Sequence, residues 1–359
     1  MQQYRQFALS LGDAALAQQQ TLRDSLKNLA NSITAYAQTS QQTWPFVVLP
    51  LFESYAMGFM DLCNAEFVGM NNFVLHEERE AFINFTSYHY HEWIDESHMI
   101  KYGNLDLLDQ DTSKFRNDIS KKTKDGFFVD QERPYYSVRT NQSPPMRAYG
   151  PLVNLNIASI GDNADVIDAA RKLRTETLVT AIKPFNALPP EDHKNFHTDS
   201  EADNPHSFMY QPVFARVQDP TSPIVGTLTS SVAWDASMQN LLPENVHGIL
   251  CVVKNSCNQV FTYEVDGPMA FYLGDGDHHD PSFNELEVTV DLSLHTHPDF
   301  TATPGHCLYS MVRSISNEQR ASSFMRKFSQ KICFLSTYTQ QSLSRMTIQQ
   351  ICLELLHRL

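Results

Sequence analysis

Residues 208–234 read FMYQPVFARVQDPTSPIVGTLTSSVAW, and this stretch decides the fold class of the chain. Two runs with apolar residues at alternate positions flank the turn-forming segment QDPTSP, a pattern that predicts two antiparallel strands joined by a turn. A second pair of runs, GILCVV and QVFTYEV, flanks KNSCN further along the chain, and DASMQNLLP between the pairs has the pattern of a short helix. Antiparallel hairpins with a helix between them predict an α+β fold, with both hairpins in one sheet, rather than a parallel α/β fold.

The sequence before these strands has mainly helical patterns. Between residues 15 and 36, five apolar positions follow one another in steps of 4, 3, 4 and 3, the spacing of a coiled-coil stripe. These positions are Leu22, Leu26, Leu29, Ile33 and Tyr36. We expect one long helix within residues 1–44, ended by Pro45. Its apolar stripe either packs on its own domain or pairs with a second copy of the chain.

Further elements are expected between this helix and the hairpins. Helical patterns occupy residues 53–63, 77–97 and 161–182, and residues 150–159 have the pattern of a strand. Residues 101–145 are polar and poor in aliphatic side chains, which predicts long irregular structure that lines a binding face. Residues 193–206 belong to a second loop of this kind.

Composition and charge argue against nucleic-acid binding and against membrane attachment of the chain. The chain has 359 residues, of which 42% are hydrophobic and 19% are charged, as in a globular protein. Its formal net charge of -14 repels phosphate groups, so we expect no nucleic-acid partner and no attachment to anionic lipid. No run reaches the roughly 18 consecutive apolar residues of a membrane helix, and we expect the chain as given to be soluble.

Metal chemistry has its main candidates in LGDGDHHD, residues 273–280. The segment begins like an EF-hand loop, but loop positions six and twelve hold Asp280 and Leu286 instead of glycine and a carboxylate. A zinc site would need this segment to meet the alternate histidines His295 and His297. The other side chains of the segment are Asp275, Asp277, His278 and His279. We expect a glycine turn with solvated side chains, no metal and no cofactor.

A second group of histidines lies in the helical pattern at residues 77–97 and just beyond it. His89, His91 and His98 have acidic neighbours, but no pair has the spacing of an HExxH metal motif. We expect all three to be solvated surface residues. The sequence also lacks a nucleophile elbow and a phosphate-binding loop, so no catalytic residue is assigned.

Six segments carry a family resemblance. They are TWPFVVLPLFE, YQPVFARV, GTLTSSVAWDASMQNLLPENVHGILCVVKNSC, FTYEVDG, YLGDGDHHDP and HTHPDF with a following cysteine. Between Leu22 and Tyr309 the chain resembles the extracytoplasmic sensor region of receptor-type adenylate and guanylate cyclases from diatoms and related algae. Those regions resemble the PAS-like Cache class, which implies a long N-terminal helix followed by an antiparallel sheet with flanking helices.

The resemblance implies a domain organisation and a cellular setting. We expect a stalk helix at 1–44, a Cache-like sensor domain at 45–309 and a divergent, helical or disordered tail at 310–359. In that family the sensor lies between two membrane helices and a cyclase domain follows, so both would lie in segments missing from this chain. The resemblance further implies an extracytoplasmic location, a disulfide between Cys257 and Cys307, and a homodimer formed through the N-terminal helix.

The leading hypothesis is a non-catalytic domain that senses a small molecule on the face of its sheet. We expect the pocket to be walled by residues 101–145 and 193–206, and an aromatic box with one arginine suits a small organic anion. The candidate ligand-binding residues are Tyr135, Tyr136, Arg139, Tyr149, Tyr210 and Trp234. The alternatives are a metal-dependent hydrolase that uses the Asp/His clusters around 275–297 and a non-functional gene fragment.

Overall fold

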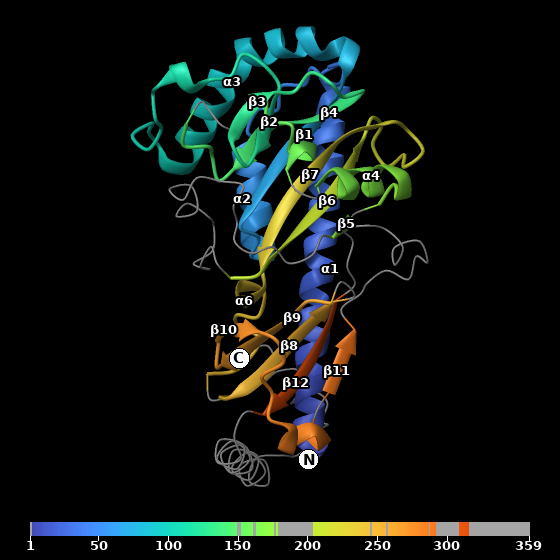
Figure 1. Ribbon diagram of the computed structural model, residues 1–359, viewed down its shortest axis with the longest axis vertical. Coiled ribbons are helices and arrows are strands. Elements are labelled where there is room, and N and C mark those ends of the chain that lie inside the picture. Colours follow the sequence, from blue (N-terminus) through green and yellow to red (C-terminus); the bar gives the residue numbers. More distant parts are fainter. Residues whose placement is uncertain are drawn as a thin grey trace, which may run out of the picture.

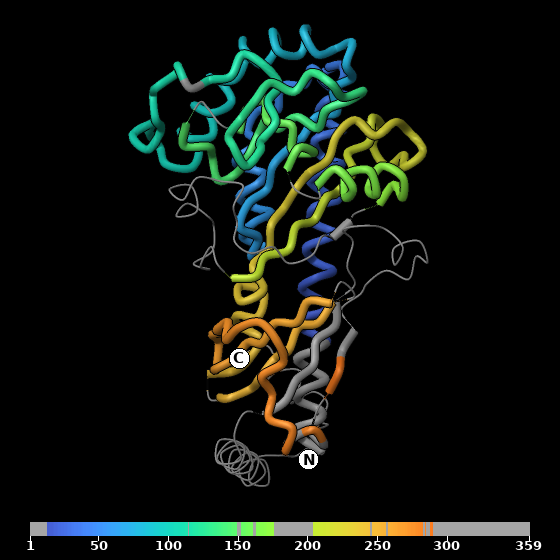
Figure 2. Tube along the Cα trace, viewed as in Figure 1, coloured from blue at the N-terminus to red at the C-terminus, as the bar shows by residue number. Residues whose placement is uncertain are grey.

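The computed structural model describes residues 2–148, 152–160, 163–175, 177–178, 204–244, 246–255, 258–286, 288–291 and 309–315. Its helices are α1 (Gln2–Thr39), α2 (Phe52–Cys63), α3 (Arg79–Tyr102), α4 (Asn163–Leu173) and the short α6 (Trp234–Ser237). Two five-stranded sheets lie one beyond the other along α1, as Figures 1 and 2 show.

The first sheet lies at the end of the molecule far from the N-terminus (Figure 1). Its order is β4-β1-β7-β6-β5, and all neighbouring strands are antiparallel. The strands are β1 (Phe67–Leu75), β4 (Tyr135–Ser143), β5 (Thr177–Leu178), β6 (His206–Phe214) and β7 (Ile224–Ala233). One face packs on α1 and α2 through Val68, Met70 and Leu228. We call the opposite face, which carries Phe67 and Phe208 and packs on α4, the inner face.

The second sheet has the order β10-β9-β8-β12-β11 and is also antiparallel throughout. Its strands are β8 (Ile249–Asn255), β9 (Val260–Asp266), β10 (Met269–Asp275), β11 (Val288–Asp291) and β12 (Tyr309–Ile315). Helix α6 leads from β7 into this part, and Trp234 packs in its core together with Ala15 of α1. Because β12 lies between β8 and β11, the β-structure extends past residue 309.

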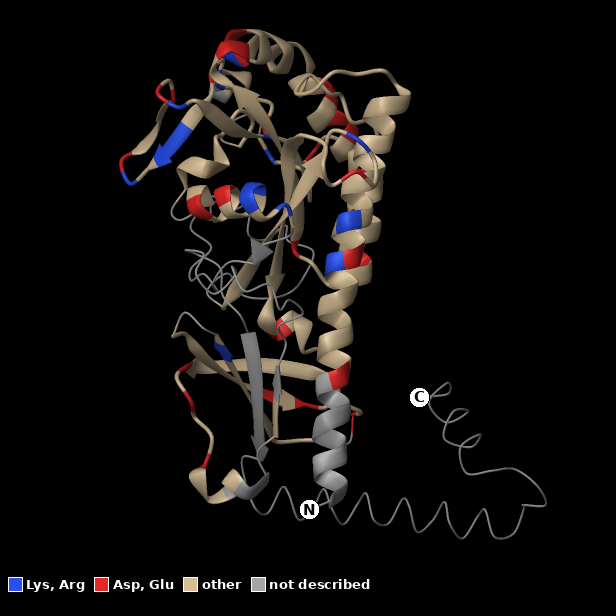
Figure 3. Cartoon of the chain, turned by 90° about the vertical axis from the view of Figure 1, so that its right-hand side faces the viewer, with Lys and Arg blue, Asp and Glu red and all other residues tan. Residues whose placement is uncertain are grey.

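Helix α1 spans both sheets, and Figure 3 shows it along one side of the whole molecule. Four of the five stripe residues are buried in the chain's own core, with exposed fractions of 2% at Leu22, 0% at Leu26, 7% at Leu29 and 6% at Ile33. Tyr36 is 37% exposed. The stripe therefore packs on its own domain, which is the first of the two interpretations of its spacing.

The α+β prediction is confirmed, and so are the two hairpins, which form β6/β7 and β8/β9. The prediction that both hairpins share one sheet is wrong, because β7 pairs with β1 whereas β8 pairs with β12. Hairpin pairing is local and visible in the sequence pattern. The second neighbours of β7 and β8 lie far away in the sequence, and no local pattern specifies them.

Two other local predictions are wrong for identifiable reasons. The expected irregular region at 101–145 contains β2 (Ser120–Thr123), β3 (Gly126–Val129) and β4. Strand β4 reads YYSVRTNQS and is buried on both faces, so it lacks the alternation of a half-exposed strand. Of the expected strand at 150–159, residues 152–156 form turns and isolated bridges and Ile157–Ser159 form a 3₁₀ turn. Its apolar side chains are buried in the core without strand geometry.

Helix α4 is confirmed but ends at Leu173, earlier than expected, and β5 follows it. Among the described helices, none combines the length and the apolar character that a bilayer crossing requires.

Candidate ligand-binding site

Buried polar side chains form a continuous group on the inner face of the first sheet. We call this group the polar row. Its members are between 0% and 8% exposed and are Gln142, Arg139, Asn71, Thr227, Thr229 and Tyr210. Cross-strand register joins them, since Asn71 lies opposite both Arg139 and Thr227, and Tyr210 lies opposite Thr229. Buried polar groups on neighbouring strands of one face are costly unless they bind one another or a ligand.

Arg139 is the only charged member of the polar row. Its Nε donates to Oδ1 of Asn71 at 2.7 Å, and its Nη1 donates to Oε1 of Gln142 at 2.8 Å. The amide of Asn71 is held in turn, because its Nδ2 donates to the hydroxyls of Thr227 at 3.2 Å and Thr229 at 2.6 Å. The guanidinium is therefore held by neutral groups that are themselves positioned by the sheet.

A β-bulge brings Arg139 and Gln142 together. Residues three apart in a regular strand point to opposite faces of a sheet. The β1–β4 register shifts between Met70 and Asn71, where Asn141 and Arg139 are the successive partners. The extra residue in β4 restores both side chains to the inner face, as bulges commonly do near binding sites.

Gly69 leaves room for the guanidinium over β1. A Cβ atom at this position would lie 2.2 Å from Nη1 and 2.4 Å from Cζ of Arg139, which is far inside van der Waals contact. The ring of Phe67, on the same face of β1, lies 5.6 Å from Cζ of Arg139, a distance at which a cation–π contact contributes. Glycine thus lets the arginine lie flat against the strand.

We predict that Gly69→Ala lowers the free energy of unfolding by about 1–3 kcal/mol, because the added methyl group displaces a buried side chain. Urea unfolding of the two proteins measures the difference. Gly58 in α2 is the matched control, since a Cβ there meets nothing within 4 Å and Gly→Ala in a helix stabilises by roughly 0.5–1 kcal/mol. Equal stability of Gly69→Ala and the parent protein would show that Arg139 does not lie against this strand.

The charge of Arg139 has no acidic partner among the described residues. The two hydrogen bonds use two of the five N–H groups of a guanidinium, so three have no acceptor in the part of the chain that the structure describes. Burial lowers the pKa of Arg139 to about 10, an effect that nearby Tyr210 partly opposes, and the group is cationic at neutral pH. A buried cation of this kind has a strong requirement for an anion.

Tyr210 adds a neutral donor beside the guanidinium. It is 1% exposed, and its hydroxyl has no hydrogen-bond partner among the described residues. Burial raises the pKa of Tyr210, and Arg139 partly opposes this, so the hydroxyl keeps its proton at neutral pH. The rings of Phe67 and Phe208 pack next to each other with centroids 5.9 Å apart, and they give this part of the inner face an aromatic surface.

The structure separates two of the other predicted ligand-binding residues, Tyr136 and Trp234, from Arg139 and Tyr210. Tyr136 packs on the other side of β4 with Phe82, and its hydroxyl lies 3.0 Å from Nδ1 of His76. Trp234 lies in the core of the second sheet and donates from Nε1 to Oγ of Ser207 at 2.8 Å.

Tyr135 lies at the edge of the site. It begins β4, bonds Asp168 of α4 through its hydroxyl and has the guanidinium of Arg171 3.9 Å from its ring centre. It therefore ties α4 to the sheet beside the inner face. Tyr149 lies outside the described residues, as does most of the loop expected at 193–206.

Sequence reasoning missed Asn71, Gly69, Gln142 and the two threonines. A signal was present in β1, which reads FVGMNNFVL. A glycine and two asparagines inside an otherwise apolar buried strand are unfavourable for a strand in isolation, and such positions mark a close approach or a buried polar network.

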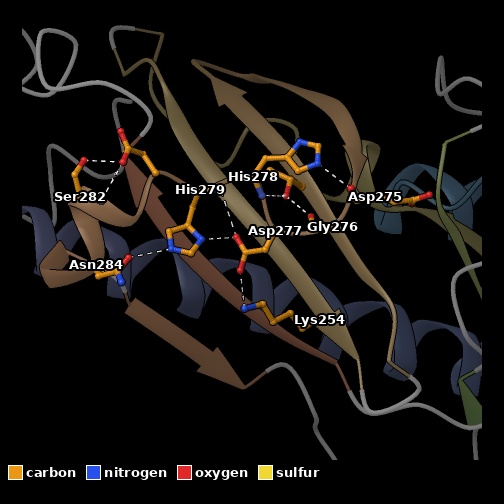
Figure 4. Close-up of polar contacts among 10 residues, drawn as sticks. Lys254, Asp275, Gly276, Asp277, His278, His279, Ser282 and Asn284 are labelled. Atoms are coloured by element: carbon orange, nitrogen blue, oxygen red, sulfur yellow. Dashed lines mark hydrogen bonds and ion pairs between the residues drawn. The ribbon is translucent and has the colours of Figure 1, made fainter.

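Side chains of the Asp/His loop of the second sheet bond one another and neighbouring residues, as Figure 4 shows. Oδ2 of Asp277 accepts from Lys254 at 2.8 Å, and Nε2 of His279 lies 3.0 Å from Oδ1 of Asn284. Burial of Asp277 opposes ionisation, but hydrogen bonds from Lys254 and His279 outweigh it and lower the pKa to about 2. His278 turns to the carbonyl of Asp275 at 2.8 Å.

No group of three or more metal-ligating side chains occurs within the described residues. His295 and His297 lie outside that part of the chain, and so do Cys257 and Cys307. The third histidine of α3 differs from the prediction of a surface group, because His98 is 0% exposed and its Nε2 lies 2.7 Å from the carbonyl of Met146. It packs beneath the loop that follows β4.

A separate cavity of about 390 Å³ lies between α1 and the start of α2. Its lining includes Leu29, Ile33, Leu49 and Phe52 and has no charged side chain. This cavity is on the side of the first sheet opposite the polar row. Its apolar lining does not suit an anion. The cavity is therefore a different place from the candidate anion site at Arg139.

No protein-family model matches the chain. A search of curated proteins likewise finds no similar sequence.

Proposed function

We propose that the chain is a non-catalytic, Cache-like sensor domain of a receptor-type nucleotide cyclase, and that it binds a small organic anion at Arg139. One observation carries the binding site: a guanidinium that is 4% exposed, has neutral partners and keeps three N–H groups without acceptors among the described residues. A carboxylate is the natural partner, because its two oxygens match the planar fork of an arginine. Tyr210 and the rings of Phe67 and Phe208 would contact the rest of the ligand.

The arrangement of elements supports a sensory role. Helix α1 packs on the first sheet and reaches the second sheet. A conformational change caused by a ligand at the inner face of the first sheet could therefore be transmitted through α1 to the second sheet. A ligand shifts such an equilibrium only through its different affinities for two states. The cyclase context, the extracytoplasmic location and the Cys257–Cys307 disulfide belong to this proposal through the family resemblance. Pairing of two copies would use the face of α1 that points away from Leu26.

A thermal-shift screen tests the function directly. Small monocarboxylates, dicarboxylates and amino acids are added to the purified chain at constant ionic strength, with chloride as the reference. A ligand at 100 times its dissociation constant stabilises by about 2.7 kcal/mol, which raises Tm by several degrees in a protein of this size. A carboxylate that raises Tm in the parent but not in Arg139→Met supports the proposal, and a panel without any such anion contradicts it.

A further inference from the structure

The junction between the two sheets contains a buried acid–histidine pair. Glu66 immediately precedes β1, His206 begins β6, and both are 0% exposed. Nε2 of His206 lies 3.0 Å from Oε1 of Glu66, and Oε2 of Glu66 accepts from the hydroxyl of Ser231 near the end of β7 at 2.9 Å. The pair therefore joins three segments of the first sheet at the point where β7 leaves for α6.

Both ring nitrogens of His206 face an oxygen. Nδ1 lies 2.5 Å from the backbone carbonyl of Asn204, which can only accept a hydrogen bond. Nε2 faces the carboxylate of Glu66. A neutral imidazole has one N–H, so the ring of His206 donates to both oxygens only when it carries a second proton and is cationic.

The negative charges around His206 favour the protonated form of its ring. Glu66 faces it directly, and Asp235 of α6 lies close by, where its Oδ2 accepts from Nδ2 of Asn204 at 2.8 Å. Burial by itself would lower the pKa of His206, but the hydrogen bond and charge of Glu66, the carbonyl of Asn204 and the charge of Asp235 together outweigh it and raise the pKa. His98, buried to the same extent, has one acceptor and no partner at Nδ1, and burial lowers its pKa.

We propose that the proton shared by Glu66 and His206 fastens the two sheets to each other and that its loss loosens their junction. After its loss, His206 keeps one N–H, which bonds either Glu66 or the carbonyl of Asn204. The other contact then sets a lone pair against an oxygen. Asn204 bonds Asp235, and the carbonyl of Pro205 accepts from the backbone N–H of Trp234 at 3.2 Å. Because both contacts hold α6 next to His206, loss of the proton weakens the attachment of α6 to the first sheet.

The direction of the pH effect follows from the raised pKa. The stability that His206 contributes is fully present below its unfolded pKa of about 6.5 and is lost as the pH rises through its folded pKa. The junction is therefore tight in mildly acidic solution and looser in alkaline solution. This inference does not depend on a ligand at Arg139.

NMR of histidine-labelled wild-type protein tests the proposal without any requirement on a variant's folding. The expected result is a His206 ring that titrates above pH 6.5 and a His98 ring that stays neutral at that pH. Glu66→Gln removes the nearest charge and should lower the proton affinity of His206 at least tenfold, which is one pKa unit. A His206 ring that is already neutral at pH 6.5 in the wild type would overturn the proposal.

Melting experiments measure the consequence for the fold. The difference in Tm between the wild type and His206→Gln should shrink by about 2–4 °C from pH 7 to pH 9. The difference in Tm between the wild type and the control His98→Gln should stay constant, because His98 is neutral throughout that range. Hydrogen exchange of the Trp234 amide, corrected for its intrinsic pH dependence, should increase over the same interval. A His206→Gln difference that does not vary with pH would contradict the fastening role.

Discussion

Arg139→Met is expected to weaken the binding of small organic anions at least about 30-fold while changing the free energy of unfolding of the ligand-free protein by less than about 2 kcal/mol. Removal of one partner of a buried, hydrogen-bonded charge pair costs roughly 2–5 kcal/mol of binding free energy, a loss of about 30-fold to several thousand-fold in affinity. Isothermal titration with an anion found in the carboxylate screen measures this loss.

The small effect on stability has a separate physical reason. Without a ligand, Arg139 is a buried cation with no charged partner among the described residues, and its replacement by an apolar side chain of similar volume removes the cost of keeping that charge away from water. The two hydrogen bonds that the variant loses, to Asn71 and Gln142, are each worth about 1 kcal/mol. The relief of desolvation offsets this loss.

Arg216→Met is the matched control for this experiment. Arg216 is in the turn region after β6, its side chain is 63% exposed and it pairs with Asp219 at 2.7 Å, so the replacement should leave both affinity and stability nearly unchanged. If Arg139→Met bound the anion as tightly as the wild type, the ligand would have to lie elsewhere. If it unfolded by several kcal/mol more easily without ligand, Arg139 would be a structural rather than a ligand-binding residue.

Leu26→Ala should lower the free energy of unfolding by about 3 kcal/mol. Leu26 is 0% exposed and packs in the core that α1 forms with α2 and the first sheet. Truncation of such a leucine removes buried apolar surface and leaves a cavity, and comparable replacements in other proteins cost about 2.7–5 kcal/mol. Urea unfolding followed by tryptophan fluorescence gives the value.

Leu62→Ala in α2 is the control, because Leu62 is 64% exposed and an exposed replacement should change stability by less than about 0.5 kcal/mol. Similar, small effects of both replacements would mean that α1 does not pack on the first sheet through this stripe. The apolar spacing of α1 would then need another explanation, such as contact with a second copy.

Local patterns were enough for the elements whose partners are near in sequence. The 4, 3, 4, 3 spacing identified α1, and turn residues between alternating runs identified β6/β7 and β8/β9. Strand β4 escaped detection because Arg139, Thr140, Asn141 and Gln142 are polar and yet buried. Their burial depends on β1, which precedes β4 by some 60 residues, and on a bulge that no local pattern encodes.

The candidate site was likewise predictable only in part from the sequence. An arginine near tyrosines suggested an anion site, and Arg139 and Tyr210 do share the inner face. Tyr136 and Trp234 were placed with them by residue type alone, although strand alternation directs Tyr136 to the other face and α6 carries Trp234 into the second core. Gly69 and Asn71 acquire their roles only when β1 lies beside β4, so residue type alone could not assign them.

A crystal structure of the chain with the tightest-binding carboxylate tests the anion site most directly. We expect the carboxylate on the inner face of the first sheet, with its oxygens about 2.7–2.9 Å from the guanidinium nitrogens of Arg139 and a further contact from the hydroxyl of Tyr210. An anion bound away from the polar row, or an acidic side chain of the chain itself paired with Arg139, would contradict that expectation.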